Sequence, residues 1–260
     1  MKLFASDFDG TLYFGENKKD IFKNNIKHIK EFQKENVFAV VTGRNVGSIQ
    51  TAFKNMNVSP DYIAGFNGGL ILDHEKVLYE DKLEIDTERL VSFVKENKAL
   101  QMTIMGKDQL YHVAFKRSLN NFLFDLFYIR KLNKMKKVKR VSDLDQKNLY
   151  MCSILCKEEE DALDLSQKIK ELNMLCSVYV NRCCIDVVGP HASKQHAVKI
   201  IQQSVQAESV YVIGDSYNDL GMIQKYQGFT LESAGEEIKK QATRVVKSVA
   251  EALEIINQQK

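Results

Sequence analysis

Two aspartates stand close together just after the first apolar run of the chain. Residues 3–6 are expected to form a buried strand, and Asp7 and Asp9 follow it. Because side chains of an extended segment alternate with a period of two, both carboxylates point the same way. Carboxylates this close repel each other unless a cation lies beside them, and Mg²⁺, an oxygen-liganded ion, suits them. The alternative is an acidic turn with only a structural role.

A second acidic cluster follows another apolar run, residues 210–213. Asp215 comes at the carboxyl end of this expected strand, and Asp219 follows four residues later. Open α/β sheets place their ligands at the carboxyl ends of parallel strands, so the two clusters together predict one composite metal site. Asp219 can ligate the ion directly, ligate it through water, or orient Lys194. Its structural alternative is a helix N-cap.

Groups that can neutralise a phosphoryl group stand at two further places. The expected strand 37–41 ends in Thr42, Gly43 and Arg44, which offer a hydroxyl and a free amide. Lys194 opens a helix after Pro190, from where its ammonium can reach both a phosphate and Asp7. Taken singly, a Thr-Gly pair is also an ordinary turn, and a lysine in a first helical turn is also an ordinary solvated side chain.

The elements around these residues predict an α/β fold. Short apolar runs at 3–6, 37–41, 62–64 and 210–213 alternate with helix-period segments, which is the pattern of a parallel sheet flanked by helices. A hairpin at 70–72 and 77–79 precedes a section with its own signals. We place an α+β domain at 83–189, inserted between core segments 1–82 and 190–260. Its expected strands are 102–105, 110–115, 149–155, 176–180 and 183–188, and its expected helices lie near 87–97, 119–130 and 158–173.

With these motifs the sequence resembles the haloacid dehalogenase (HAD) superfamily of aspartyl-phosphate hydrolases, in particular its Cof-type branch, the subclass IIB phosphatases. The four family motifs occur in order: DFDGTL at 7–12, TGR at 42–44, Lys194, and GDSYNDLGM at 214–222. The resemblance covers the whole core, and the insert has the size and position of the cap of this branch. It implies a Rossmann-like parallel-sheet core with an inserted α+β cap domain that sets substrate choice.

The resemblance also implies a role for each motif. Asp7 attacks the phosphorus, and Asp9 protonates the leaving group and then activates the hydrolytic water. Thr42 and Lys194 hold the phosphate oxygens. The implied Mg²⁺ ligands are Asp7, the carbonyl of Asp9, and Asp215, with Asp219 close behind.

Several residues are expected on the substrate side. Asn67 and Gly68 resemble a further Cof-type signature in which the Asn faces the active site, although a β-turn explains the pair nearly as well. Arg44 and Asn218 are expected beside them, with the amide of Gly43. In the insert, Arg182 and Asp186 are candidates for contact with the leaving group.

The expected function is therefore a Mg²⁺-dependent phosphatase of small phosphorylated metabolites. Sugar phosphates and phosphorylated cofactors are the candidate substrates. Two alternatives stay open: a sugar phosphomutase, and a binding or regulatory protein that retains the fold without turnover. The resemblance implies that Asp9 favours phosphate-ester hydrolysis, because the dehalogenases of the family lack an acid at that position, and the complete set of motifs argues against a pure binder.

The composition of the chain limits the classes of molecule that it is expected to bind. A net charge of +3 and a pI near 8.4 suit anionic substrates without indicating a nucleic-acid or membrane surface. Basic residues crowd the stretch 130–140, which we interpret as a solvated surface rather than a nucleic-acid site. Five cysteines without a C-x-x-C pair indicate neither a disulfide framework nor a zinc site. No apolar run approaches the roughly 20 residues that cross a bilayer. We expect a cytoplasmic monomer or weak homodimer.

Overall fold

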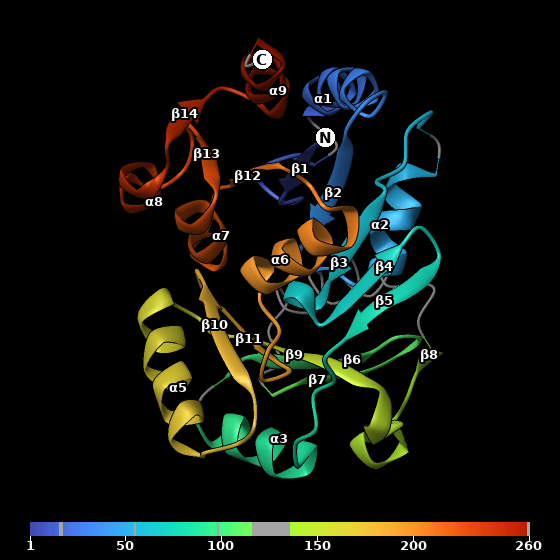
Figure 1. The fold of residues 1–260 in the computed structure, drawn as a ribbon. Coiled ribbons are helices and arrows are strands. Elements are labelled where there is room, and N and C mark those ends of the chain that lie inside the picture. The colour runs from blue at the N-terminus through green and yellow to red at the C-terminus, as the bar shows by residue number, and fades with distance from the viewer. Residues whose placement is uncertain (16–17, 55, 98, 116–135, 259–260) are drawn as a thin grey trace. The chain divides into compact units, whose positions relative to one another are not determined.

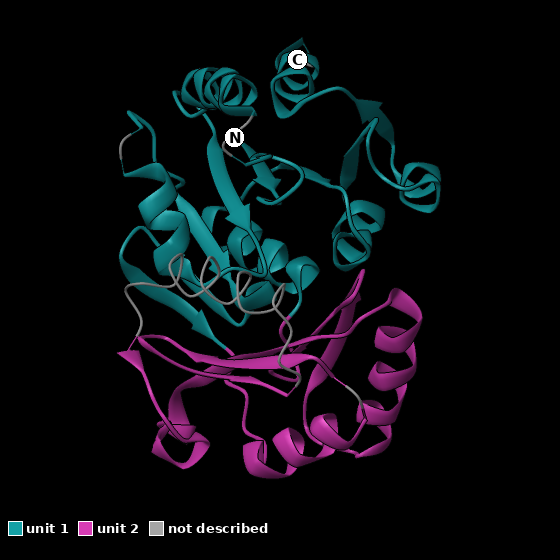
Figure 2. Cartoon of the chain, turned by 180° about the vertical axis from the view of Figure 1, so that it is seen from behind, with its two compact units in different colours: residues 1–80, 193–260 teal, residues 81–192 magenta. Residues whose placement is uncertain are grey.

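The chain divides into two compact units. The computed structural model describes residues 1–15, 18–54, 56–97, 99–115 and 136–258. The core unit comprises Met1–Glu80 and Ser193–Lys260, and the inserted unit comprises Asp81–Ala192 (Figure 2). The sequence placed the insert at 83–189, within three residues of these bounds.

An eight-stranded sheet forms the centre of the core unit (Figure 1). Its order is β14-β13-β12-β1-β2-β3-β4-β5, and the strands from β14 to β3 pair in parallel. The last two strands add antiparallel pairs, as the predicted hairpin requires. The strands are β1 (Lys2–Ser6), β2 (Val37–Val41), β3 (Tyr62–Gly65), β4 (Leu70–Asp73), β5 (Lys76–Glu80), β12 (Ser209–Gly214), β13 (Gln227–Leu231) and β14 (Arg244–Val246).

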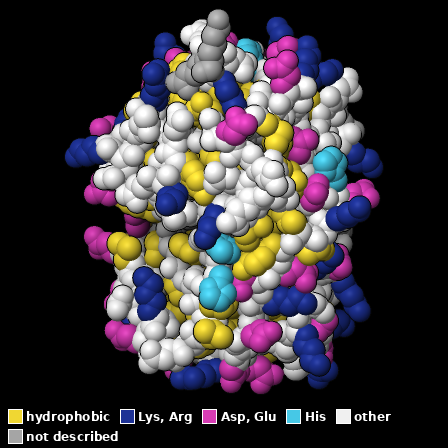
Figure 3. Space-filling view, in the orientation of Figure 1, with side chains coloured by type: hydrophobic (Ala, Val, Ile, Leu, Met, Phe, Trp, Pro, Cys, Tyr) yellow, Lys and Arg dark blue, Asp and Glu magenta, His cyan; other side chains and the backbone are white. Residues whose placement is uncertain are grey.

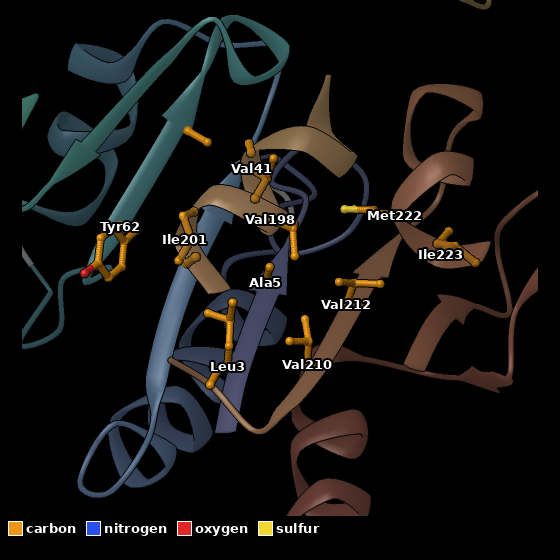
Figure 4. Close-up of a cluster of buried hydrophobic side chains, with 14 of the residues drawn as sticks. Leu3, Ala5, Val41, Tyr62, Val198, Ile201, Val210, Val212, Met222 and Ile223 are labelled. Atoms are coloured by element: carbon orange, nitrogen blue, oxygen red, sulfur yellow. The ribbon is translucent and has the colours of Figure 1, made fainter. Parts of the chain in front are cut away.

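Helices cover both faces of this sheet because the strands are apolar on both sides. Leu3 and Ala5 of β1 pack against Val198 and Ile201 of α6 (Figure 4). On the opposite face Phe4 contacts Phe32 of α1 with ring centroids 6.0 Å apart. The helices are α1 (Lys19–Phe32), α2 (Val46–Phe53), α6 (Lys194–Val205), α7 (Leu220–Lys225), α8 (Glu236–Gln241) and α9 (Val249–Gln258).

The described part of the inserted unit is a six-stranded sheet with two helices packed on one face. Its order is β10-β11-β9-β6-β7-β8, antiparallel except for the short pair β7 and β8. Helices α3 (Thr87–Glu96) and α5 (Glu159–Glu171) pack on one apolar face. The strands are β6 (Gln101–Gly106), β7 (Gln109–Ala114), β8 (Lys136–Lys137), β9 (Leu149–Leu155), β10 (Ser177–Asn181) and β11 (Cys184–Val188); 3₁₀ turns lie at Val141–Asp143 and Gln146–Asn148.

Two predictions fall partly or wholly outside the described residues. The helix expected near 119–130 lies within the undescribed stretch, and so does the first part of the basic stretch 130–140. The predicted α/β class with a parallel-sheet core is confirmed.

The described surface carries charges of both signs. On the face shown in Figure 3, positive and negative side chains are interspersed among polar and apolar ones. This agrees with the small net charge of +3. Among the described helices, none combines the length and the apolar character that crossing a bilayer demands.

Candidate active site

A buried lysine joins two buried aspartates at the carboxyl end of the parallel sheet. Leu3 and Ala5 face α6, and continued alternation directs Asp7 to the same side. Lys194 is the first residue of α6, and it shares the buried stripe of that helix with Val198, four residues on. Its Nζ lies 2.7 Å from Asp7 Oδ1 and 2.7 Å from Asp219 Oδ1. The predicted contact between Lys194 and Asp7 is therefore present.

Burial and charge act against each other in this trio. Burial raises the pKa of Asp7 well above its ordinary value, Asp219 and Asp215 add to the rise, and Lys194 opposes it. Burial also disfavours the ammonium of Lys194, but the carboxylates of Asp219 and Asp7 outweigh that effect and raise the pKa of Lys194. Lys194 is therefore protonated at neutral pH, and its charge favours the ionised form of Asp7.

Asp219 is held in place by donors from its own turn. Its Oδ2 accepts hydrogen bonds from the backbone N–H of Asp215 at 3.2 Å and of Ser216 at 3.0 Å, and from the Ser216 hydroxyl at 3.1 Å. These contacts cap the 3₁₀ turn Tyr217–Asp219. Since Oδ1 is bonded to Lys194, Asp219 has the geometry of a residue that positions the lysine and caps the turn.

Asp215 lies against the turn that follows Asp7. Its Oδ1 accepts a hydrogen bond of 2.8 Å from the Thr11 hydroxyl. Gly10 has a φ of +80°, and a Cβ at this position would lie 2.6 Å from Asp215 Oδ2. The turn therefore requires glycine both for its backbone conformation and for the close approach of Asp215. The first and fourth motifs, more than 200 residues apart in the chain, meet here.

Asp7, Asp215 and Asp219 form the only group of potential metal ligands found among the described residues. One carboxylate oxygen of each lies within 4.8 Å of the others. This oxygen-rich donor set is of the kind that Mg²⁺ prefers. The Asp9 carboxylate is not part of this group, which is compatible with its expected role through the backbone carbonyl.

Asp9 pairs instead with Arg44, a contact that the sequence analysis did not predict. The guanidinium donates from Nε to Oδ2 at 2.6 Å and from Nη2 to Oδ1 at 2.5 Å. It also lies over the ring of Phe8, with 4.8 Å between Cζ and the ring centroid. The Asp9 side chain is 53% exposed, unlike the buried Asp7. Asp9 and Arg44 each follow the carboxyl end of a strand, and these two strands, β1 and β2, are parallel neighbours in the sheet. The pair could therefore have been predicted from the expectation that two consecutive parallel strands lie side by side.

Thr42, Asn67 and Asn218 are linked to one another. The backbone N–H of Asn67 donates to the Thr42 carbonyl at 2.9 Å, and Asn218 Nδ2 donates to Asn67 Oδ1 at 3.2 Å. Thr42 is 1% exposed, and its hydroxyl oxygen accepts from the Arg44 N–H at 3.1 Å; Gly43 is half-buried between them. Asn218 Oδ1 is buried, with no hydrogen-bond partner in the described part of the chain.

The corner after β3 has an unusual backbone. Phe66, Asn67 and Gly68 all have positive φ values, of 53°, 54° and 97°. A Cβ at Gly68 would lie 2.5 Å from the Ser193 carbonyl oxygen, so this corner packs closely against the start of α6. Apart from Arg182 and Asp186 in the inserted unit, the residues that the sequence proposed as catalytic, substrate-binding or metal-binding belong to the core unit, in turns at the strand ends or at the start of α6.

The fold and the site define a class of protein: a parallel α/β sheet with an inserted α+β unit and an acidic cluster at the carboxyl ends of its strands. The sequence model of the haloacid dehalogenase-like hydrolases matches residues 4–253, and the chain belongs to this family. The predicted membership is thus confirmed.

Relatives extend over nearly the whole chain. An uncharacterized protein of Mycoplasma capricolum is 28% identical over 242 residues, which are 86% of this chain and 88% of the relative. A Mycoplasma pneumoniae protein, provisionally named a phosphatase, is 24% identical over 260 residues, 93% of this chain and 89% of the relative. A solved sugar phosphatase of HAD subclass IIB superposes with a TM-score of 0.80 at 16% identity, covering 99% of both chains. The chain therefore shares the fold of this sugar phosphatase.

Proposed function

We propose that this HAD-family hydrolase is a Mg²⁺-dependent phosphatase that cleaves phosphate monoesters of small metabolites through an aspartyl phosphate on Asp7. The observation that carries the proposal is the buried contact of Lys194 with Asp7 and Asp219, each at 2.7 Å. A nucleophilic carboxylate must be ionised although it is buried, and the lysine favours that state. The provisional phosphatase name of the Mycoplasma pneumoniae relative agrees with this reading.

The acidic cluster fits the metal that this family generally uses. Asp7 and Asp215 would hold Mg²⁺, with Asp219 behind them, because Asp219 is engaged by Lys194 and Ser216. When bound, the ion supplies positive charge against the negative charge of the phosphoryl group. Side chains of the protein would neutralise the rest of the negative charge of the phosphoryl group. Lys194 would hold a phosphate oxygen, and the Thr42 hydroxyl would donate to another.

The free Asp7 oxygen would attack the phosphorus while the alcohol oxygen leaves with the bonding electrons. Asp9 would give its proton to that oxygen and then take one from the water that hydrolyses the aspartyl phosphate. In the structure both Asp9 oxygens are bonded to Arg44. An Asp9 that acts as acid and base must exchange at least one of these contacts for the substrate. Arg44 could then bind the phosphate-bearing group itself.

The test is Mg²⁺-dependent release of phosphate from a panel of small esters by wild type, Asp7→Asn and a matched control. Asp20→Asn is that control, because Asp20 is fully exposed on α1. We expect phosphate release to require Mg²⁺ and to fall about a thousandfold or more in Asp7→Asn, since the nucleophile is lost. Acid-quenched wild type should also carry phosphate on Asp7. Equal rates in wild type and Asp7→Asn would refute the mechanism, and negligible rates on every ester would refute the phosphatase function.

A further inference from the structure

Strand β10 forms one edge of the sheet in the inserted unit (Figure 1), and its only neighbour among the described strands is β11. All five of its residues are partly exposed, and none of them is charged. The other three edge strands of the two described sheets carry charge: β5 begins with Lys76 and ends with Glu80, β14 begins with Arg244, and β8 is Lys136–Lys137. Charged side chains on an edge strand hinder pairing with another chain, and β10 lacks this protection.

The backbone groups on the open side of β10 belong to two valines. The loop between β10 and β11 has two residues, 182 and 183, so the flanking residues Asn181 and Cys184 form a hydrogen-bonded pair. Bonded and non-bonded pairs alternate along an antiparallel ladder, so Val178 and Val180 lie in non-bonded pairs with β11. Their N–H and C=O groups therefore point away from β11, toward the open edge, where a further strand can pair with them.

The sequence of β10 fits a second copy of itself. Tyr179 is the central residue, with Val178 and Val180 beside it and the polar Ser177 and Asn181 at the ends. When two such strands pair antiparallel with Tyr179 opposite its own copy, Val178 lies opposite Val180. These are the residues whose backbone groups point outward, so each of the two valine pairs exchanges both hydrogen bonds. The side chains match in the same register, because tyrosine meets tyrosine and serine meets asparagine.

An exposed apolar side chain extends this edge beyond the strand. Leu175 lies two residues before β10 and is 70% exposed. In the same register it lies beside the loop at residues 182 and 183 of the second copy. Pairing of two β10 strands would therefore withdraw apolar surface from water as well as satisfy backbone groups.

We propose that the protein forms a weak homodimer by antiparallel pairing of β10 with β10 of a second copy, with Tyr179 at the two-fold axis. The contact is isologous, so it closes as a dimer and does not continue into a fibre. Its affinity is low because each copy contributes little more than one short strand. The pairing uses residues of the inserted unit alone and does not depend on the proposed phosphatase function.

The first test is sedimentation velocity of the full-length protein over about 1–300 μM, a range that suits a small interface. The dimer fraction of wild type should rise with concentration. Tyr179→Lys and Tyr179→Glu each place two like charges at the axis, and each should weaken dimerisation about tenfold or more. An equimolar mixture of the two variants should recover the dimer, because lysine then faces glutamate. Tyr217→Lys is the matched control at a tyrosine of the core unit that is 48% exposed, and it should dimerise like wild type.

The mixture separates pairing at the axis from a structural effect of the substitutions. Both variants lose the hydrogen bond of 2.9 Å from the Tyr179 hydroxyl to the Ala192 carbonyl, so that loss cannot produce a recovery in the mixture. The proposal is overturned by a wild type that stays monomeric over the whole range. It is equally overturned by a Tyr179→Lys variant that dimerises like wild type, or by a mixture no more dimeric than its components.

A cross-link tests the register. Tyr179 is in a hydrogen-bonded pair with Asp186 of β11, so across the open edge it would form a non-bonded pair with its copy, with Cα atoms about 4.5 Å apart. This separation suits a disulfide, so Tyr179→Cys should give a disulfide-linked dimer with oxidised glutathione, seen as a new band in non-reducing electrophoresis relative to wild type. Ser177→Cys is the matched control and should give no such band, because residue 177 lies opposite residue 181 of the second copy. Absence of the band in Tyr179→Cys, or an equal band in Ser177→Cys, would contradict the proposed pairing.

Discussion

Replacing Lys194 by methionine tests whether its charge holds the site together. The variant keeps the length of the side chain and removes the ammonium, which leaves the buried carboxylates of Asp7 and Asp219 facing each other. Their oxygens lie within 4.8 Å. At that separation two unit charges repel by about 3.5 kcal/mol at an effective dielectric constant of about 20. Protonating one carboxyl at neutral pH instead costs about 4 kcal/mol from an ordinary pKa of about 3.9.

Whether the two carboxylates repel each other or one of them takes up a proton, the free energy of unfolding should fall by about 3–4 kcal/mol, which is within the range for breaking a buried ion pair. The assay is urea unfolding followed by far-UV circular dichroism, in EDTA so that no divalent ion compensates the lost charge. Lys199→Met is the matched control, since Lys199 lies on the same helix and is exposed. It should change stability by no more than about 0.5 kcal/mol.

The loss in Lys194→Met should also depend on pH. In the variant, burial and Asp219 raise the folded pKa of Asp7 without the opposing ammonium. A raised folded pKa gives stability that is complete below the unfolded pKa and is lost as the pH rises. The deficit relative to wild type should therefore shrink from pH 7 towards pH 5. A deficit below about 1 kcal/mol at pH 7, or one that does not change with pH, would show that the two carboxylates are not the buried charges that the argument requires.

Two further predictions concern backbone and thiols. Gly68→Ala should lower the free energy of unfolding by about 1–3 kcal/mol, because a Cβ there would lie 2.5 Å from the Ser193 carbonyl oxygen. Gly15→Ala is the control in the same urea assay, and it should lower the free energy of unfolding by less because a Cβ at Gly15 would have no atom within 4 Å. Burial raises the pKa of Cys156 from 9.0 to about 11 and that of Cys184 to about 12. As the pH rises through 9, these thiols lose their protons in the unfolded chain before they do so in the folded protein, so the free energy of unfolding should fall. Urea unfolding between pH 8 and pH 11 should show a shallower fall in Cys156→Ala, and an equal fall would contradict this assignment.

The parts of the site that the sequence could locate are those fixed by local patterns. Strand 37–41 was expected from its apolar run, and β2 has the same bounds, Val37–Val41. The three-to-four-residue spacing of Lys194, Val198 and Ile201 places the lysine on the buried stripe of α6, so its approach to the sheet followed from helix periodicity. Functional residues that follow strands can be predicted from the sequence to lie near one another, because parallel strands bring their carboxyl ends to the same edge of the sheet.

Contacts set by the register of distant strands could not be predicted in the same way. Thr103 of β6 lies opposite Ser153 of β9, and no local pattern in the sequence states this pairing. Of the two candidates in the insert, Asp186 accepts a hydrogen bond of 3.0 Å from the Ser153 hydroxyl on the neighbouring strand, whereas Arg182 lies in the turn between β10 and β11 with a φ of 53°. Helices α7 and α8 have six residues each, too few to show a helical period.

Asp7 and Asp219 differ from Asp9 in burial and in charged partner. Asp7 and Asp219 share one buried ammonium, and a proton or a substitution there changes the stability of the core unit as well as its chemistry. Asp9 is 53% exposed and is held by Arg44 in a pair of the partly exposed kind, which typically contributes about 0–1 kcal/mol. An incoming phosphate can compete for Arg44 at that small cost, and its arrival would free the Asp9 carboxyl. In the proposed mechanism, the group that gains and loses protons during turnover is thus separated from the group that stays ionised, and Asp9 can exchange partners without disturbing the buried charges of Asp7, Lys194 and Asp219.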